Sequence, residues 1–227
     1  MPLILSFVLA AISWWGEASS VDLSSDGTIV AVGASDNGHV RVYKYANKAW
    51  TQMGADIDGE AVGDRSGEAV SLTSDGAFLA VGAPSNHGIN GPKSGHVRVY
   101  KYANSKWTQL GADIDREAAY DYSGFSVSLS RNYMRGVLLR LAVGAYDNSG
   151  SFPDSYSGHV RVYQFANNAW TRQLGADIDG EASGDGSGVS VSLSGDGTVL
   201  AAITNKRLVM RHDQFQYQHS LSVYPTD

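Results

Sequence analysis

The stretch GHVRVYKYANKAW, from Gly38 to Trp50, decides the fold because the chain contains it three times. Nearly the same letters return as GHVRVYKYANSKW over 95–107 and as GHVRVYQFANNAW over 158–170. The tryptophans that end these copies are 57 and 63 residues apart. This period is longer than that of most helical repeats and suits a unit of four short strands with their loops.

Alternation of residue types within each unit predicts β-strands. In GHVRVYKYA, Val40 and Val42 fall on one face of a strand and Arg41 on the other. The upstream segment 68–83, EAVSLTSDGAFLAVGA, has two β-rich runs separated by Ser-Asp-Gly, which is typical of a tight hairpin. The short stretch 50–53 supplies a fourth strand. Such a four-stranded antiparallel blade must stack on neighbours to bury both its faces, which explains the repetition.

Matching segments begin the other units at 19–34, 125–145 and 189–204, and the last unit loses the pattern in its later half. We therefore predict an all-β, β-propeller-like array of four-stranded antiparallel blades, three of them clear and the fourth degenerate. The repeats occupy 19–204. A divergent tail over 205–227 alternates enough in QFQYQHSLSVY to form one or two strands that complete the last blade.

The N-terminal segment 1–18 carries an apolar run from Leu3 to Ile12. This run is too short to span a bilayer, so no membrane span is expected, but its length suits the core of a signal peptide. The first basic residue is Arg41, so the positively charged region of a signal peptide is missing. A signal peptide and an N-terminal strand that completes the fold both remain open.

Composition excludes several function classes. The formal net charge is −6 and no Lys/Arg run exceeds two residues, which argues against a nucleic-acid partner. The chain has no cysteine, so disulfides, thiolate nucleophiles and sulfur-ligated zinc are excluded. No GxSxG, phosphate-loop or HExxH motif occurs, and we expect no enzyme. A propeller-type glycoside hydrolase or lyase is the alternative, since carboxylates of several blades can converge in a central channel.

The submotifs SGFSVSLS, LAVGA or AVGAP, and GHVRVYKY resemble the FG-GAP repeats of integrin-α-type β-propellers, and the resemblance extends over 19–204. It implies an extracellular propeller, commonly of seven blades, that binds a ligand or an adhesion partner. On this basis we expect a secreted or cell-surface protein. The predicted blades are fewer than a usual ring, so the chain is a fragment, a four-bladed ring, or an open stack completed by self-assembly.

Many FG-GAP repeats bind calcium in a loop of alternating aspartates between the first two strands of a blade. Here that loop offers one carboxylate in each unit, at Asp26, Asp75 and Asp196. Calcium prefers about six to eight oxygen ligands, so these turns are not calcium sites.

An acidic motif after the fourth strand is the most regular polar feature of the repeat. Its carboxylates are spaced two residues apart like the first half of a calcium loop, and we expect no cofactor, with calcium at this motif as the alternative. The structural alternative is a solvent-exposed connection anchored by Ile57, Ile114 and Ile178, which turn inward. The carboxylates are Asp56, Asp58 and Glu60; Asp113, Asp115 and Glu117; and Asp177, Asp179 and Glu181.

His39, His96 and His159 occupy equivalent positions in different units. The stacking of blades separates equivalent positions, and the arginine two residues after each histidine repels a cation. We therefore expect a structural polar row rather than a zinc site, with each arginine stacked on an aromatic ring or paired with the acidic motif.

We call the repeated stretch, 38–50 in its first copy, the cassette. The loop that precedes it differs between units, from SDN to PSNHGINGPKS and YDNSGSFPDSYS. Unequal loops on a constant scaffold are where specificity usually lies, so we expect a non-enzymatic binding or adhesion module that recognises a protein or glycan. Loops that are merely tolerated insertions are one alternative, and a structural segment of a larger adhesin is another. The expected ligand-binding residues are His87, Asn90, Lys93, Tyr146, Asp147, Asn148, Phe152, Asp154 and Tyr156.

Overall fold

A computed structural model describes residues 18–88, 90–115, 118–132, 138–148, 156–172, 176–204, 208–211 and 219–221. Residues 1–17, which hold most of the predicted signal peptide or N-terminal strand, lie outside these ranges. None of the described residues forms a helix, so none belongs to a helix with the length and hydrophobicity of a membrane span.

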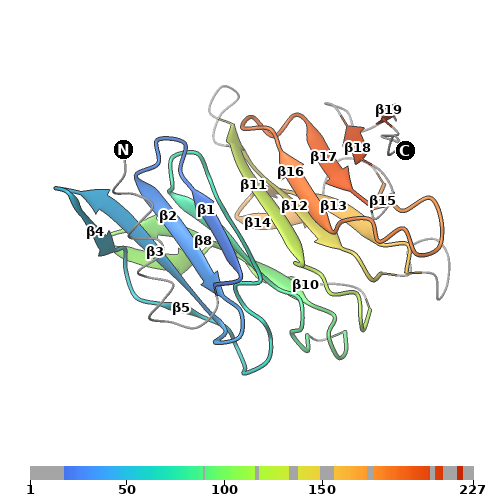
Figure 1. The fold of residues 1–227 in the computed structure, drawn as a ribbon, viewed down its shortest axis with the longest axis horizontal. Helices are drawn as coiled ribbons and strands as arrows, with labels where there is room; N and C mark the ends of the chain where they lie inside the picture. The colour runs from blue at the N-terminus through green and yellow to red at the C-terminus, as the bar shows by residue number, and fades with distance from the viewer. Residues whose placement is uncertain are drawn as a thin grey trace, which may run out of the picture.

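Four antiparallel sheets follow one another along the chain, as the sequence predicted (Figure 1). Blade 1 contains β1 (Ser20–Leu23), β2 (Ile29–Ala34), β3 (His39–Ala46), β4 (Ala49–Gln52) and β5 (Ile57–Asp58). Blade 2 contains β6 (Ala69–Leu72), β7 (Phe78–Ala83), β8 (His96–Ala103), β9 (Lys106–Gln109) and β10 (Ile114–Asp115). Blade 3 contains β11 (Ser126–Asn132), β12 (Leu138–Ala145), β13 (His159–Ala166), β14 (Ala169–Arg172) and β15 (Ile178–Asp179). Blade 4 contains β16 (Ser190–Leu193), β17 (Leu200–Ile203), β18 (Leu208–Arg211) and β19 (His219–Leu221).

The outer edge of each cassette strand is covered in two pieces, which the sequence did not predict. In blade 1, β4 pairs with the second half of β3 and the two-residue β5 pairs with its start, placing Asp58 opposite His39. Gly54 has a φ of 78° between the two pieces and allows the chain to turn there. Part of the acidic motif is therefore strand, and its isoleucine points into the core with 6% exposure at Ile57.

The blades stack face to face in chain order, and their first strands, β1, β6, β11 and β16, lie side by side (Figure 1). A hydrophobic cluster fills each junction. Between blades 1 and 2 it includes Val40 and Val42 of the cassette together with Leu72 and Leu79, all of which are buried. The cassette valines therefore face the core, as their alternation predicts.

Hydrogen bonds that recur from blade to blade connect each blade to the next. The tryptophan that ends a cassette donates from Nε1 to a carbonyl of the preceding blade, from Trp107 to Met53 and from Trp170 to Leu110, both at 2.8 Å. A side chain of the first strand also accepts a hydrogen bond from a leucine N–H of the next blade. In blade 2, Ser71 Oγ accepts from the Leu129 N–H at 3.0 Å. These contacts identify the tryptophan as a contact between blades.

The outer face of blade 1 has no blade against it among the described residues. Val21 and Leu23 of β1 are 56% and 48% exposed. The leucines at the same position in the next two blades, Leu72 and Leu129, are 5% and 6% exposed. The difference follows from stacking alone, because the three residues have the same place in the repeat.

Candidate functional site

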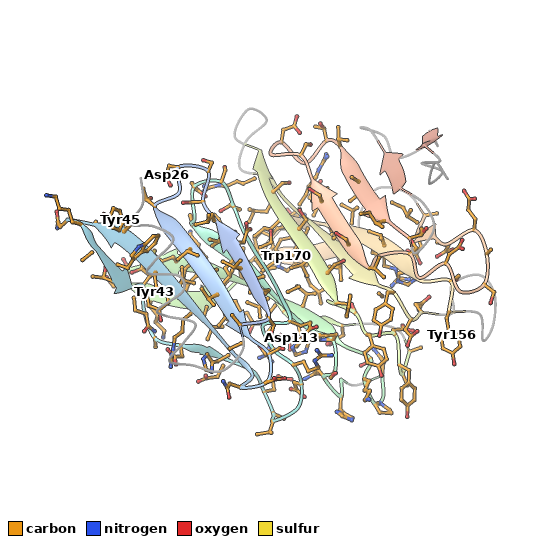
Figure 2. All side chains as sticks on the ribbon, in the orientation of Figure 1. Asp26, Tyr43, Tyr45, Asp113, Tyr156 and Trp170 are labelled. Carbon is orange, nitrogen blue, oxygen red and sulfur yellow. The ribbon has the colours of Figure 1, made fainter. Side chains whose placement is uncertain are left out.

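One end of the blades carries both the loops before the cassettes and the connections between blades; we call it the loop end. Asp113 and Tyr156 lie at this end, whereas Asp26 and Tyr45 lie at the opposite one (Figure 2). The loops there bond to one another, since Tyr120 and Tyr122 donate from their backbone N–H groups to the carbonyls of Pro92 and Lys93, at 2.9 and 3.1 Å. The loop end is thus an ordered surface in its described part.

Aromatic rings gather at the junction of blades 2 and 3. We define the aromatic patch as Tyr120, Tyr122, Phe125 and Tyr146. The ring of Tyr146 lies 5.8 Å from that of Tyr122 and 4.4 Å from that of Phe125, centroid to centroid. Lys93 Nζ lies 5.6 Å from the centre of the Tyr122 ring, within the range of a cation–π contact. Tyr120 precedes Tyr122 by two residues in the same connection and is 55% exposed, so this surface presents a large ring to solvent.

Two tyrosines of the patch adopt a backbone conformation that favours glycine. Tyr120 and Tyr122 have φ angles of 64° and 53°. A bulky residue with positive φ costs about 1 kcal/mol or more, and such conformations cluster at functional sites. The connections of the other blades place smaller or polar residues at these two positions, namely Gly63 and Arg65 before blade 2 and Gly184 and Gly186 before blade 4.

The predicted ligand-binding residues divide into three groups. The patch brings Lys93 and Tyr146 together through Tyr122. Asp147 and Asn148 are half-buried next to the patch in sequence, while the other described residues are exposed elsewhere on the loop end. These are His87, Asn90 and Tyr156; Phe152 and Asp154 lie outside the described residues.

Sequence reasoning missed Tyr120, Tyr122 and Phe125. They belong to the connection between blades, where EAAYDYSGFS in one copy corresponds to EAVGDRSGEA and EASGDGSGVS in the others. The signal is the difference between these copies, because three aromatic residues occur in one copy only.

The first aspartate of each acidic motif pairs with the cassette arginine. Arg41 Nε donates to Asp56 at 2.6 Å, Arg98 Nε to Asp113 at 3.1 Å, and Arg161 Nε to Asp177 at 2.7 Å. These pairs realise the predicted contact of the cassette arginine with the acidic motif. The second aspartates, Asp58, Asp115 and Asp179, pair through their backbones with the cassette histidines. Glu60 and Glu181 lie on the connections that follow, and Glu117 lies outside the described residues.

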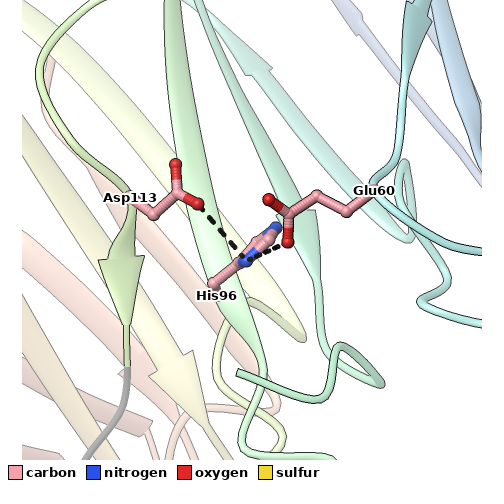
Figure 3. A group of neighbouring side chains, drawn as sticks. All are labelled: Glu60, His96 and Asp113. Atoms are coloured by element: carbon pink, nitrogen blue, oxygen red, sulfur yellow. Dashed lines mark ion pairs between the residues drawn. The ribbon is translucent and has the colours of Figure 1, made fainter. Parts of the chain in front are cut away.

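His96 lies among carboxylates of two blades, which the sequence analysis did not predict (Figure 3). Its Nδ1 atom is 3.9 Å from Glu60 Oε2, 4.0 Å from Asp113 Oδ2 and 3.9 Å from Asp115 Oδ1. The three histidines lie in different blades, as expected, but the connection from blade 1 delivers Glu60 to His96. Arg98 also pairs with Glu60.

The environment of this cluster shifts several pKa values. Burial, with a contribution from the positive charge of Arg98, lowers the pKa of His96. Burial also raises the pKa of Asp115, and the negative charges of Asp113 and Glu60 add to this shift. Burial opposes ionisation of Asp113 too, but hydrogen bonds from Arg98 and Gln109 outweigh it and lower that pKa. The imidazole is thus neutral at pH 7, and Asp115 carries an incompletely compensated charge.

Asp115→Asn is expected to raise the melting temperature of the EDTA-treated protein at pH 7, by roughly 1–3 °C. A carboxyl with a raised folded-state pKa favours folding below its unfolded pKa of about 3.9, and this contribution is lost as pH rises through the folded value. The charged group therefore costs stability at pH 7, and asparagine removes that charge. Thermal unfolding at pH 7 and pH 4 measures the effect, which should shrink at pH 4.

Asp58→Asn is the matched control for this substitution, because Asp58 has the same place in blade 1 but no glutamate from a preceding blade within the described part. We expect a smaller change there. A lower melting temperature for Asp115→Asn at pH 7 would contradict the electrostatic argument.

No protein-family model and no curated protein matches the sequence. Solved β-propellers do match. The Cps50 (Swd1) β-propeller domain of Myceliophteria thermophila aligns with a TM-score of 0.61 at 13% identity, over 92% of this chain and 56% of that one. U3-55K aligns with a TM-score of 0.54, and the RRP9 WD40 repeats with a TM-score of 0.56, each at 10% identity over 90% of this chain and 51% of the other. This chain thus spans about half of the length of these structures, and the similarity shows the propeller fold.

The identification with FG-GAP repeats of integrin-α type is wrong, since these neighbours are propellers of the WD40 kind. The submotifs that suggested FG-GAP repeats have functions that any four-stranded blade requires. The alternation in GHVRVYKY forms a strand, and the glycine in AVGA allows the next blade to approach. The prediction of a secreted or cell-surface protein is wrong for the same reason, because it rested on that family and the neighbours point away from secretion.

Proposed function

We propose that the chain is a non-enzymatic, protein-binding module whose docking surface is the aromatic patch at the junction of blades 2 and 3. The observation that carries this proposal is the positive φ of Tyr120 and Tyr122, at positions where the connection to blade 4 has glycine. The positive φ of Tyr120 costs folding free energy and its ring is 55% exposed, which supports a role for this ring in contact with a partner.

The chemistry of the patch suits a protein partner. Tyrosine contributes a large apolar area and one hydroxyl at a low cost in conformational entropy, and it is enriched among the residues that dominate binding energy. Lys93 adds a positive charge at the edge of the patch. WD40 propellers among the structural neighbours support a role in protein interaction. Adhesion rested on the FG-GAP resemblance, which is wrong, and it is not part of this proposal.

A catalytic role has less support. The acid–base mechanism of a glycoside hydrolase needs one carboxyl that stays protonated and a second that is free to attack or to activate water. Asp113 is instead held by Arg98 and Gln109. The same arginine–aspartate pair recurs in blades 1 and 3, which indicates a structural function for it.

The double substitution Tyr120→Gly/Tyr122→Gly tests the proposal, because it installs the residues found at Gly184 and Gly186. The probe is a displayed library of random dodecapeptides selected on the unmodified protein. We expect selected peptides to lose at least about tenfold in affinity for the variant, since a hot-spot residue contributes about 2 kcal/mol or more. We also expect its melting temperature to stay within about 3 °C of the parent, because relief of positive φ offsets lost ring contacts.

Lys48→Gly is the control, because Lys48 also has a positive φ, of 64°, but lies in the turn between β3 and β4, at the end of the blades opposite the patch. It should leave peptide affinity unchanged. A library that yields no binder, or binders that ignore the double substitution, would overturn the proposal. Binding to a glycan array that is lost in the same variant, without any peptide binder, would replace the protein partner with a glycan.

A further inference from the structure

We propose that Glu60, His96, Asp113 and Asp115 form a site for a zinc-like divalent cation at the junction of blades 1 and 2. The site goes beyond the protein-binding function and lies on other residues. One ligand comes from the connection that leaves blade 1, and the other three belong to blade 2. A bound ion would therefore link the two blades.

The geometry places three oxygens around one nitrogen. His96 Nδ1 lies 3.9–4.0 Å from the nearest oxygen of each carboxylate, which is too far for a hydrogen bond. Four ligands at zinc bond lengths of about 2.0–2.1 Å are separated by roughly 3.4 Å in a tetrahedron. The donor atoms of Glu60, His96 and Asp113 all lie within 4.8 Å of one another, so side-chain movements of about an ångström would bring these three to one ion. Asp115 approaches the imidazole but lies outside this closer group, and it would join the ion after a larger movement.

The imidazole supplies an independent sign of a ligand. The His96 side chain is only 4% exposed and points into the cluster (Figure 3). All three carboxylates lie 3.9–4.0 Å from Nδ1, so none of them hydrogen-bonds the ring. A buried histidine in a structural role usually finds a hydrogen-bond partner, whereas this ring is surrounded by three carboxylates and the guanidinium of Arg98.

The charge of the cluster matches a divalent cation. Three carboxylates face one guanidinium, that of Arg98, which leaves about two negative charges in a half-buried site. Arg98 Nε holds Asp113 Oδ1 at 3.1 Å, and its Nη2 pairs with Glu60 Oε1. The oxygens nearest the imidazole are Glu60 Oε2 and Asp113 Oδ2. Arg98 thus leaves Glu60 Oε2 to the imidazole, but its Nη2 also donates to Asp113 Oδ2 at 3.1 Å, so an ion would share that oxygen with the guanidinium.

The donor set favours zinc over calcium. Calcium prefers oxygen ligands alone, whereas imidazole together with carboxylates is a common zinc set. The proposal therefore differs from a calcium loop in the acidic motif, because the histidine is essential and the ligands come from two copies of the motif.

The repeat supplies a matched control for each ligand. Glu181 has the place of Glu60 in the connection to blade 4. Blade 4 has β18, around Val209, where the other blades have the cassette strand, and its sequence has no counterpart of His96. His39 has the place of His96 in blade 1, where no preceding connection supplies a glutamate in the described part. His159 lies near Asp177 and Asp179 in a similar group, which could bind a second ion. The test therefore asks whether one molar equivalent of bound zinc is lost when His96 is replaced.

Zinc titration by calorimetry on the full chain after EDTA treatment and dialysis tests the site. We expect saturable binding with a dissociation constant of about 10 μM or tighter, and loss of one equivalent in His96→Gln and in Glu60→Gln. His39→Gln and Glu181→Gln should keep that equivalent. Cobalt as a substitute should give visible absorption bands of a four-coordinate ion, and His96→Gln should lower their intensity by about one site.

Circular dichroism of each variant without metal shows whether it folds, so that loss of binding is separable from unfolding. Absence of saturable zinc binding up to about 100 μM would overturn the proposal. Zinc binding that survives both His96→Gln and Glu60→Gln would overturn it as well, as would calcium binding at this cluster that ignores His96→Gln. None of these results depends on the aromatic patch, so the two proposals fail independently.

Discussion

Gly82→Ala is expected to lower the free energy of unfolding by about 3 kcal/mol or more, the upper range for overpacking a closed interior. A Cβ at Gly82 would overlap the carbonyl oxygen of Gly124 and lie 2.9 Å from its carbonyl carbon. Both are backbone atoms at the start of blade 3, so a side-chain rotation cannot relieve the overlap. The same close approach occurs between Gly33 and Gly67 and between Gly144 and Gly188. The alanine would therefore push β7 of blade 2 away from the segment that leads into β11 of blade 3.

Urea unfolding followed by tryptophan fluorescence measures the change, and thermal unfolding should show a fall of roughly 6–12 °C. Gly195→Ala is the control, because a Cβ there meets no atom within 4 Å and the residue does not have positive φ. We expect that variant to be unchanged or more stable by a few tenths of a kcal/mol. Equal stability of Gly82→Ala and the parent protein would contradict the stacked arrangement of blades 2 and 3.

The strand pattern was predictable because it depends on neighbours in sequence. The alternation around Val40 and Val42 and the Ser-Asp-Gly turns indicated hairpins, and both valines are buried at 0% and 1% exposure. The split outer edge was not predictable from alternation, since β5 is only two residues long. The partner of the Trp107 indole was not predictable either, because Met53 lies in another blade and its backbone carbonyl leaves no mark on the sequence pattern.

The two candidate sites differ in how far the sequence could reveal them. Tyr120 and Tyr122 stand out once the connections between blades are aligned, because their counterparts in blade 4 are glycines. The contact of Glu60 with His96 cannot be found by such an alignment. These residues have different places in the repeat and belong to different copies, so only the stacking of one blade on the next brings them together.

Leu72→Ala is expected to lower the free energy of unfolding by about 2–5 kcal/mol, the range for a leucine removed from a closed core. Leu72 is 5% exposed in the cluster between blades 1 and 2. Leu23 is its counterpart in blade 1 and is 48% exposed. Leu23→Ala should cost less than about 0.5 kcal/mol, since little apolar area leaves water at that site on folding.

The comparison also tests whether the outer face of blade 1 meets solvent. The two leucines have the same place in the repeat and differ in whether a described blade precedes them. The difference between the two changes in free energy therefore measures what the blade–blade junction adds to the contribution of this one side chain. If Leu23→Ala costs as much as Leu72→Ala in urea unfolding, another copy of the chain covers that face in solution. The effect would then depend on protein concentration, because dilution separates the copies and leaves Leu72 unaffected.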